Sequence, residues 1–243
     1  MQLTALRDLP EVDPGADLAS LLAEACPPDL ASGDVLVVAH KIVSKAEGRT
    51  RRLGDVFPGK RAIALASEQG KDPRLVQAVL DESAEVLRAD HGVLICETRH
   101  GLVCANAGID RSNAPGDDEL ILLPEDPDAS ARRLRAGLPG RPAVVITDSF
   151  GRAWRLGQTD VAIGTAGIVP LEDWSGRRDA HGRELRVTAI AVADAVAAGA
   201  DLARTKSSGE PAVLVRGLER FVTPDDGPGA AALRRPRELD LFR

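Results

Sequence analysis

Short apolar runs recur along the chain, and each of them ends at charged or turn-forming residues. The most regular run, Val144 to Thr147, is rich in β-branched residues and is followed directly by Asp148 and Ser149. A run of this length and composition is typical of a buried strand. Similar runs, also predicted to be strands, occupy residues 35–39, 93–97, 102–105 and 212–216.

Between these runs, apolar residues repeat at helical spacing, and aspartate–proline pairs mark where helices begin. The pairs Asp13-Pro14, Asp72-Pro73 and Asp126-Pro127 each combine an N-cap residue with a first-turn proline. The pattern that follows Asp72 predicts a helix with apolar positions from Leu75 to Leu87, and an alanine-rich helical pattern covers residues 187–202.

The segment after the central apolar run carries side chains suited to metal and phosphate chemistry. In open α/β sheets, ligands bind beyond the carboxyl ends of strands, where Asp148 and Ser149 are expected. A carboxylate beside a hydroxyl suits Mg²⁺ or Mn²⁺. Arg152 and Arg155 follow in the same predicted loop and could hold phosphate or carboxylate in a bidentate manner. A strand-end turn with Asp148 capping a helix and solvated arginines explains the same spacing, and spacing alone slightly favours that simpler explanation.

Two more polar clusters come directly after apolar runs. The first contains His40, Lys41, Ser44 and Lys45, and lysine is a common point-charge partner for phosphate. The second, residues 106–113, offers a carboxylate, two amides, a hydroxyl and a guanidinium. A solvated helix start accounts for the first cluster and an Asx-rich turn for the second, so neither identifies a site by itself.

Residues 54–60 imitate the spacing of a phosphate-binding loop, with Gly54, Gly59 and Lys60 in the expected positions. However, Arg61 stands where a metal-binding serine or threonine is required, and Pro58 lies inside the loop. No convincing apolar strand leads into the segment. We interpret it as a polar surface connection.

Composition excludes several classes of protein. The formal net charge is −6 and there is no basic run, which argues against a nucleic-acid binder that relies on electrostatics. Tyrosine is absent and aromatics are scarce, so bases are not bound on a stacking platform. The chain starts without an apolar targeting region and has no run of membrane-spanning length, so we expect no membrane partner and a cytoplasmic location.

Three cysteines are too few and too scattered for a disulfide scaffold or a zinc knuckle. The predicted hairpin would let Cys96 face Cys104, and buried reduced thiols are the expected state. The polar stretch 171–185 is interpreted as a lid or an oligomer arm, with a surface loop as the simpler alternative. The tail from Thr223 is rich in proline, glycine and charge, and it is expected to fray.

With these clusters in hand, the chain resembles the coenzyme F420 γ-glutamyl ligases, including the N-terminal ligase domain of two-domain actinobacterial forms. The matching stretches cover nearly the whole chain in order. They are residues 9–11, 33–48, 97–101, 104–113, 147–167, 182–185 and 211–217. The chain end at 241–243 resembles the junction before the reductase domain of the two-domain forms, so the tail 223–243 is a candidate linker.

The resemblance implies a fold, an activity and an assembly. The fold is α/β with a mixed sheet peculiar to the family, formed by one ligase domain over residues 1–243 and assembled as an intertwined homodimer. The activity adds L-glutamate to the lactyl-phosphate carboxylate of the coenzyme precursor, and then adds further glutamates through γ-linkages. It uses GTP and a divalent metal, Mg²⁺ or Mn²⁺, and a monovalent cation such as K⁺ is a further candidate.

The resemblance also implies site residues. The metal ligands carry over to Asp110, Asp148 and Ser149. The GTP contacts carry over to Leu9, Pro10, Glu11, Val12, His40, Lys45 and Asn113, with a further nucleotide loop at about residues 203–210. We interpret Asp110, Asp148, Lys45 and Arg152 as the catalytic set, with Lys45 and Arg152 cancelling phosphate charge. This chain departs from the family pattern at His40, where relatives carry a small hydroxyl residue, and at Thr205, where an acidic or amide residue can hold a second metal.

This set suits a ligase that first activates a carboxylate. Phosphoryl transfer from GTP would give an acyl phosphate, which the amine of glutamate attacks; the first step depends on charge neutralisation and positioning. Two alternatives remain open from the sequence. One is a metal-dependent nucleotide phosphohydrolase with the same acids, and the other is a non-catalytic nucleotide-binding or dimerisation module.

Overall fold

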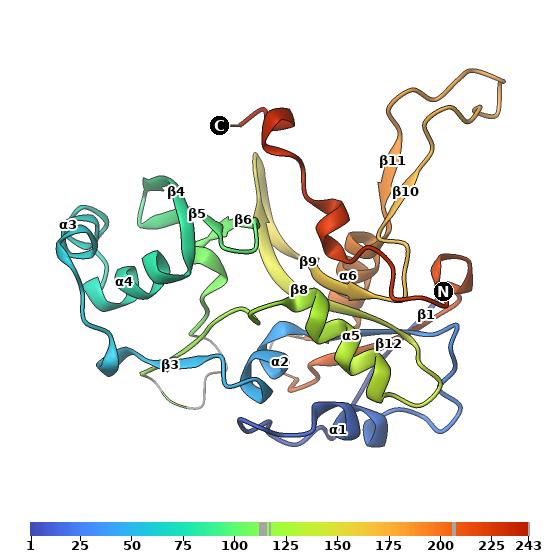
Figure 1. Ribbon diagram of the computed structural model, residues 1–243, viewed down its shortest axis with the longest axis horizontal. Coiled ribbons are helices and arrows are strands. Elements are labelled where there is room, and N and C mark those ends of the chain that lie inside the picture. The colour runs from blue at the N-terminus through green and yellow to red at the C-terminus, as the bar shows by residue number, and fades with distance from the viewer. Residues whose placement is uncertain (112–115, 117, 206–207, 243) are drawn as a thin grey trace.

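A mixed five-stranded sheet forms the centre of the computed structural model, which describes residues 1–111, 116, 118–205 and 208–242 (Figure 1). The strands follow the spatial order β1 (Gln2–Ala5), β12 (Ala212–Arg216), β2 (Val35–Ala39), β8 (Ala143–Arg152) and β9 (Arg155–Ala166). β2 and β8 are parallel, and the other neighbouring pairs are antiparallel. The α/β architecture with a mixed sheet is therefore confirmed, and the structure does not test the predicted dimer.

Helices cover both faces of this sheet, which explains why its strands are apolar at consecutive positions. On one face, Leu36 and Ile146 pack against three helices, α1 (Leu18–Ala25), α2 (His40–Ala46) and α5 (Pro127–Gly137). On the other face, Val37 and Val145 pack against α6 (Val192–Ala203). Fully buried runs such as 35–38 are thus predicted correctly as strands because no position of theirs faces water.

A second lobe, residues 60–108, packs around a core of its own, on the left of Figure 1. Its elements are α3 (Lys60–Gln69), α4 (Pro73–Glu82), β4 (Ser83–Asp90), β5 (Val93–Thr98) and β6 (Val103–Ala105). A short ladder between β3 (Thr50–Arg52) and β7 (Glu119–Ile121) lies between this lobe and the central sheet. Cys96 pairs with Cys104 across β5 and β6, as predicted, and both thiols are free and buried. Burial raises the pKa of Cys104 to about 12, which keeps that thiol protonated and unreactive.

Three helix boundaries differ from the predictions. α1 begins at Leu18, because Asp17 rather than Asp13 caps it by accepting the Ser20 N–H. α4 ends at Glu82, and the apolar residues 86 and 87 belong instead to β4, which pairs with β5. α6 begins only at Val192, after the strand β11 (Ala189–Ala191).

The other predicted local structures are present. Asp72-Pro73 and Asp126-Pro127 begin α4 and α5, and each aspartate accepts a backbone N–H as a helix cap. The segment 54–60 forms a connection that ends where α3 begins, and it carries an exposed Phe57, so the interpretation as a surface connection is confirmed.

An extended arm projects from the body of the protein at residues 171–191 (Figure 1). β10 (Leu171–Asp173) pairs antiparallel with β11 at its base. Further out, the guanidinium of Arg177 lies 4.8 Å from the centre of the Trp174 ring, which is cation–π geometry. The stretch is therefore an extended arm that is regular at its base, and further out it consists of turns and bends with an isolated bridge between Arg178 and Glu184.

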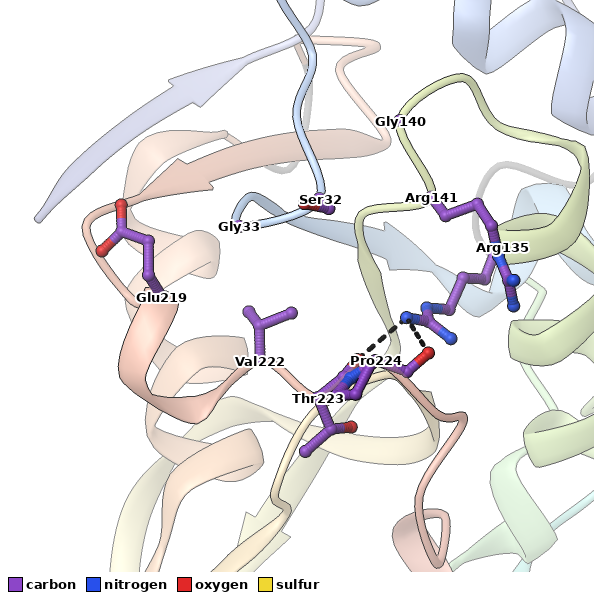
Figure 2. A pocket seen from close by; sticks show the side chains of 9 residues that line it. All are labelled: Ser32, Gly33, Arg135, Gly140, Arg141, Glu219, Val222, Thr223 and Pro224. Atoms are coloured by element: carbon purple, nitrogen blue, oxygen red, sulfur yellow. Dashed lines mark hydrogen bonds between the residues drawn. The ribbon is translucent and has the colours of Figure 1, made fainter.

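The tail from Thr223 to Leu233 does not fray, because buried polar groups of the body hold it. Figure 2 shows the hydrogen bonds of Arg135 to Thr223 and Pro224. The Arg135 guanidinium is 3% exposed and donates to the Asp226 carboxylate at 2.7 Å and to the Thr223 carbonyl at 2.9 Å. The buried Asp128 carboxylate accepts the Ala230 N–H at 2.7 Å. Arg135 lines a cavity of about 540 Å³, and its positive charge is already paired with Asp226 of the same chain.

No helix in the described part of the chain is both long enough and apolar enough to cross a membrane.

Candidate functional site

A cleft of about 640 Å³ opens where β2 ends beside its parallel neighbour β8, which continues. Five segments distant in sequence line it: the stretch before α1, the junction of β2 and α2, the strands β8 and β9, and the loop that leads into β12. The cleft brings together most of the predicted site residues. These are Leu9, Pro10, Glu11, Val12, His40, Lys45, Asp148 and Ser149, and they are joined by Thr205.

Asp148 and Ser149 lie inside β8, not at its end. β8 continues to Arg152 as one half of a long hairpin with β9. Its parallel neighbour β2 ends at Ala39, opposite Thr147. Asp148 and Ser149 therefore follow directly on the carboxyl edge of the parallel pair, which is where α/β sheets bind ligands. The alternative in which Asp148 caps a helix is excluded, because Asp148 lies within β8 and the next element is the strand β9. The Asp148 carboxylate accepts the Ser149 N–H at 2.8 Å.

Because β8 continues, Arg152 and Arg155 lie at the far end of the hairpin and do not line the cleft. Arg152 lies four positions after Asp148, a distance of roughly 13 Å along the strand. The Arg152 guanidinium is exposed and donates to the Leu156 carbonyl at 3.1 Å. The sequence predicted a loop that would fold these arginines over the site, and the structure instead has a strand pair that carries them away from it.

His40 is the first residue of α2, and its ring is buried between that helix and β8. It is 1% exposed. Its Nδ1 lies 3.3 Å from the Ser44 hydroxyl, one helical turn further on, and its Nε2 lies 3.3 Å from the Asp148 carboxylate. The second contact lacks the alignment of a hydrogen bond. His40 thus supports the wall of the cleft beside Asp148.

Lys45 supplies a buried positive charge from the same helix. The residue is 6% exposed, and its ammonium forms an ion pair with the largely exposed carboxylate of Glu11. α2 begins where β2 ends, so the chain turn that starts the helix also places Lys45 at the cleft. A buried ammonium requires an anionic partner, and a mobile surface carboxylate is one that a ligand can replace.

Asp110 lies beside the cleft rather than in it. It forms an isolated bridge with Ile121, and its carboxylate accepts from the Lys41 ammonium at 2.7 Å. Lys41 does line the cleft, so this ion pair connects Asp110 to the cleft wall. Asn113, the remaining predicted GTP contact, is outside the described residues.

The sequence interpretation assigned no role to Asp160, which the structure places at the centre of the polar contacts. The residue is 2% exposed and lines the cleft from β9. Its carboxylate accepts from the hydroxyls of Ser149 and Thr147 at 2.7 and 2.8 Å, and it pairs with Arg204. One feature of the sequence could have indicated Asp160: it is an acidic residue at the start of a run, 160–166, that otherwise contains only apolar and small residues.

The donor set of the cleft suits a hard cation held jointly with a ligand. Among the described residues, no group of three or more histidines, cysteines or acids is arranged to hold a metal. Mg²⁺, however, is usually bound by one or two carboxylates together with water and substrate phosphates. The Asp148 carboxylate and the Ser149 hydroxyl, adjacent in the cleft, provide oxygen ligands of this kind. They fit an ion that arrives with a phosphate ligand, not one enclosed by protein alone.

Comparison with known proteins places this cleft in a family. The model of the F420-0:gamma-glutamyl ligase family matches residues 7–217, which include every segment that lines the cleft. The chain belongs to this ligase family. A coenzyme F420:L-glutamate ligase of Methanothermobacter thermautotrophicus is 45% identical over 252 residues, covering 100% of this chain and 99% of the relative.

Two further relatives come from other organisms. The coenzyme F420:L-glutamate ligase of Methanopyrus kandleri is 45% identical and covers 96% of this chain and 94% of its own. That of Halobacterium salinarum is 47% identical and covers 100% of this chain and 96% of its own. The similarity to these F420-0:gamma-glutamyl ligase family members therefore covers the second lobe, the arm and the tail as well as the cleft.

Proposed function

We propose that this member of the F420-0:gamma-glutamyl ligase family joins L-glutamate to the carboxylate of a coenzyme F420 precursor, with GTP and a divalent metal ion. The observation that carries the proposal is the meeting of a buried lysine with an aspartate–serine pair in one cleft, at the carboxyl edge of β2 and β8. The names of the relatives, which are 45–47% identical over nearly the full chain, support the acceptor and the amino acid.

Lys45 and Asp148, which carry opposite charges, would have different roles in binding a nucleotide. Lys45 would bind a phosphate oxygen and give up Glu11 as its partner, because Glu11 is mostly exposed and can return to water at small cost. Asp148 and Ser149 would hold the metal ion from the β8 side, and Asp110 could join them if Lys41 turned to the phosphates. A bound divalent ion would neutralise charge between the nucleotide phosphates during transfer.

A carboxylate is a poor electrophile, so the precursor carboxylate would have to be activated before glutamate can attack it. Transfer of the γ-phosphoryl group to the precursor carboxylate forms an acyl phosphate and releases GDP. The neutral amine of glutamate attacks the acyl carbon, and the C–O bond to phosphate breaks. The residues of the chain hold the phosphates in line and cancel their charge, which is the main requirement of such a transfer. Further γ-linked additions would repeat these steps on the newly added carboxylate.

The proposal is tested by the dependence of phosphate release on each substrate. We expect phosphate release from GTP only when precursor and glutamate are both present, and we expect removal of divalent metal to abolish it. ATP should replace GTP poorly. Full turnover after exhaustive metal removal would contradict the metal requirement. Phosphate release without glutamate would instead favour a phosphohydrolase, and nucleotide binding without any turnover would favour a non-catalytic module.

We also propose that the protein is a homodimer in which the arm contacts the partner subunit. The arm carries apolar side chains that its own subunit leaves in water, with Val187 93% exposed and Ile190 44% exposed. Such side chains on an extended hairpin are stabilised when a second copy covers them. Light scattering at micromolar concentration should report a dimer. A monomer that still ligates glutamate would contradict this assembly.

A further inference from the structure

We propose that Asp160 and Arg204 form a positioning pair that sets the Ser149 hydroxyl as an acceptor toward a cation in the cleft. The inference rests on the proposed function, because it concerns how the chain prepares one of the metal ligands. Asp160 and Arg204 do not themselves touch the reacting groups in this proposal. They act through Ser149.

The hairpin register fixes this arrangement. Ser149 of β8 pairs directly with Asp160 of β9, so the two side chains share a face of the sheet. The Ser149 hydroxyl donates to the Asp160 carboxylate at 2.7 Å, and Thr147, two residues earlier on the same face, donates at 2.8 Å. The carboxylate therefore binds both hydroxyls of the strand segment that passes the cleft.

Arg204 completes the pair from the C-terminal end of α6. One guanidinium nitrogen contacts both Asp160 and the Thr147 hydroxyl, and the other donates to the Pro211 carbonyl at 2.8 Å. Arg204 thus connects β9 with the loop that leads into β12, and both line the cleft. The side chain of Arg204 is 8% exposed and that of Asp160 is 2% exposed.

Stability alone does not explain a buried ion pair at this place. Removing two charges from water carries a desolvation cost that their attraction often fails to recover, and apolar residues of similar size commonly serve as well or better. A buried pair that lines the cleft and contacts two hydroxyls there is better explained by its effect on those hydroxyls.

The effect on Ser149 follows from the direction of its hydrogen bond. Because the hydroxyl proton is given to Asp160, the oxygen can act toward the cleft only as an acceptor. An anionic partner also makes that oxygen a stronger ligand, as carboxylates behind metal-bound histidines do. Ser149 is thereby suited to a cation and unsuited to donating a hydrogen bond to a phosphate.

The test is the affinity of the protein–GDP complex for Mn²⁺, with protein in excess over GDP, measured by the paramagnetic resonance signal of the free ion. Asp160→Asn presents an amide in place of the carboxylate and should weaken Mn²⁺ binding roughly 10- to 100-fold, the range found when a group behind a metal ligand is lost. Ser149→Ala should weaken it as well. The double variant should bind no more weakly than Ser149→Ala alone, because Asp160 acts through that hydroxyl.

Asp194→Asn provides a matched control. Asp194 accepts the Ala162 N–H at 2.9 Å and does not line the cleft. The substitution therefore removes a charge next to the same strand and leaves the residues of the cleft unchanged. Its Mn²⁺ affinity should equal that of the wild type. If Asp160→Asn does not fold, as judged by circular dichroism, Arg204→Lys replaces it and should weaken Mn²⁺ binding in the same direction.

Three results would overturn the inference. A folded Asp160→Asn or Arg204→Lys protein with wild-type Mn²⁺ affinity would leave the pair a purely structural role. Additive losses in the double variant would mean that Asp160 acts independently of Ser149. A wild-type protein that binds no Mn²⁺ even in its complex with GDP would remove the metal from the proposed function, and this inference with it. The first two results leave the proposed function intact, so the two failures are distinguishable.

Discussion

Replacing Asp148 with asparagine should reduce glutamate ligation by about a hundredfold or more, the scale of loss when one positioned electrostatic contact of a transition state is removed. The substitution keeps the shape of the side chain and an acceptor for the Ser149 N–H, which now approaches at 2.8 Å. It removes the negative charge that we propose binds the cation. The expected defect is therefore chemical rather than structural, and it should appear in the rate of ligation and in Mn²⁺ affinity together.

Binding of GTP without metal separates this account from simple charge attraction. Asp148→Asn should not weaken metal-free GTP binding, and it should strengthen it slightly, because a charge that repels the phosphates is gone. Asp90→Asn is a suitable control, since Asp90 is a partly exposed acid of the second lobe, outside the residues that line the cleft. Wild-type ligation by Asp148→Asn would mean that the site has been assigned to the wrong residues.

Replacing Lys45 should have the opposite effect on metal-free GTP binding from Asp148→Asn. Lys45→Ala should weaken GTP binding roughly tenfold or more both with and without metal, since hydrogen bonds to charged groups contribute about 1.5–3 kcal/mol. The physical reason is that Lys45 is 6% exposed, so its charge acts where water screens it poorly. Calorimetric titration with GTP, with and without Mn²⁺, measures both conditions.

Lys60 offers a control that also tests the segment resembling a phosphate-binding loop. Lys60→Ala removes an exposed ammonium at the start of α3, and GTP affinity should not change. Equal losses in Lys45→Ala and Lys60→Ala would show that net charge, not the cleft, governs nucleotide binding. Unchanged GTP affinity in Lys45→Ala alone would remove Lys45 from the binding site.

The central strands could be predicted because their own composition and length are enough to identify them. Residues 35–38 and 143–146 are apolar at every position, and both faces of the sheet are covered, so composition and length suffice. The helix predicted to reach residue 87 fails for a tertiary reason. Val86 fits helical spacing, but pairing with Cys96 of β5 draws it into a strand.

The site was predictable residue by residue only in part. Asp148, Ser149 and Lys45 follow apolar strands in sequence, and that signal placed them correctly beside one another at the carboxyl edge of the sheet. The role of Asp160 depends on the register of β8 with β9, which periodicity does not specify across a hairpin of this length. The same hairpin carries Arg152 away from the cleft, and no local pattern indicates that β8 continues through a glycine at 151.

The order of the tail also depends on distant partners. Its proline, glycine and charged residues indicate disorder when they are considered alone. Asp226 and Ala230 are nevertheless held by Arg135 and Asp128 of α5, about ninety or more positions earlier in the chain. Composition indicates whether a segment would be ordered by itself in water. Here the buried side chains of α5 order the tail.

The most direct test of the account is mass spectrometry of the coenzyme precursor after incubation with the protein, GTP, Mn²⁺ and L-glutamate. The account predicts products heavier by one or more glutamyl residues, formed with release of one phosphate per residue added, and lost in Asp148→Asn. Consumption of GTP with no glutamyl product under these conditions would contradict it.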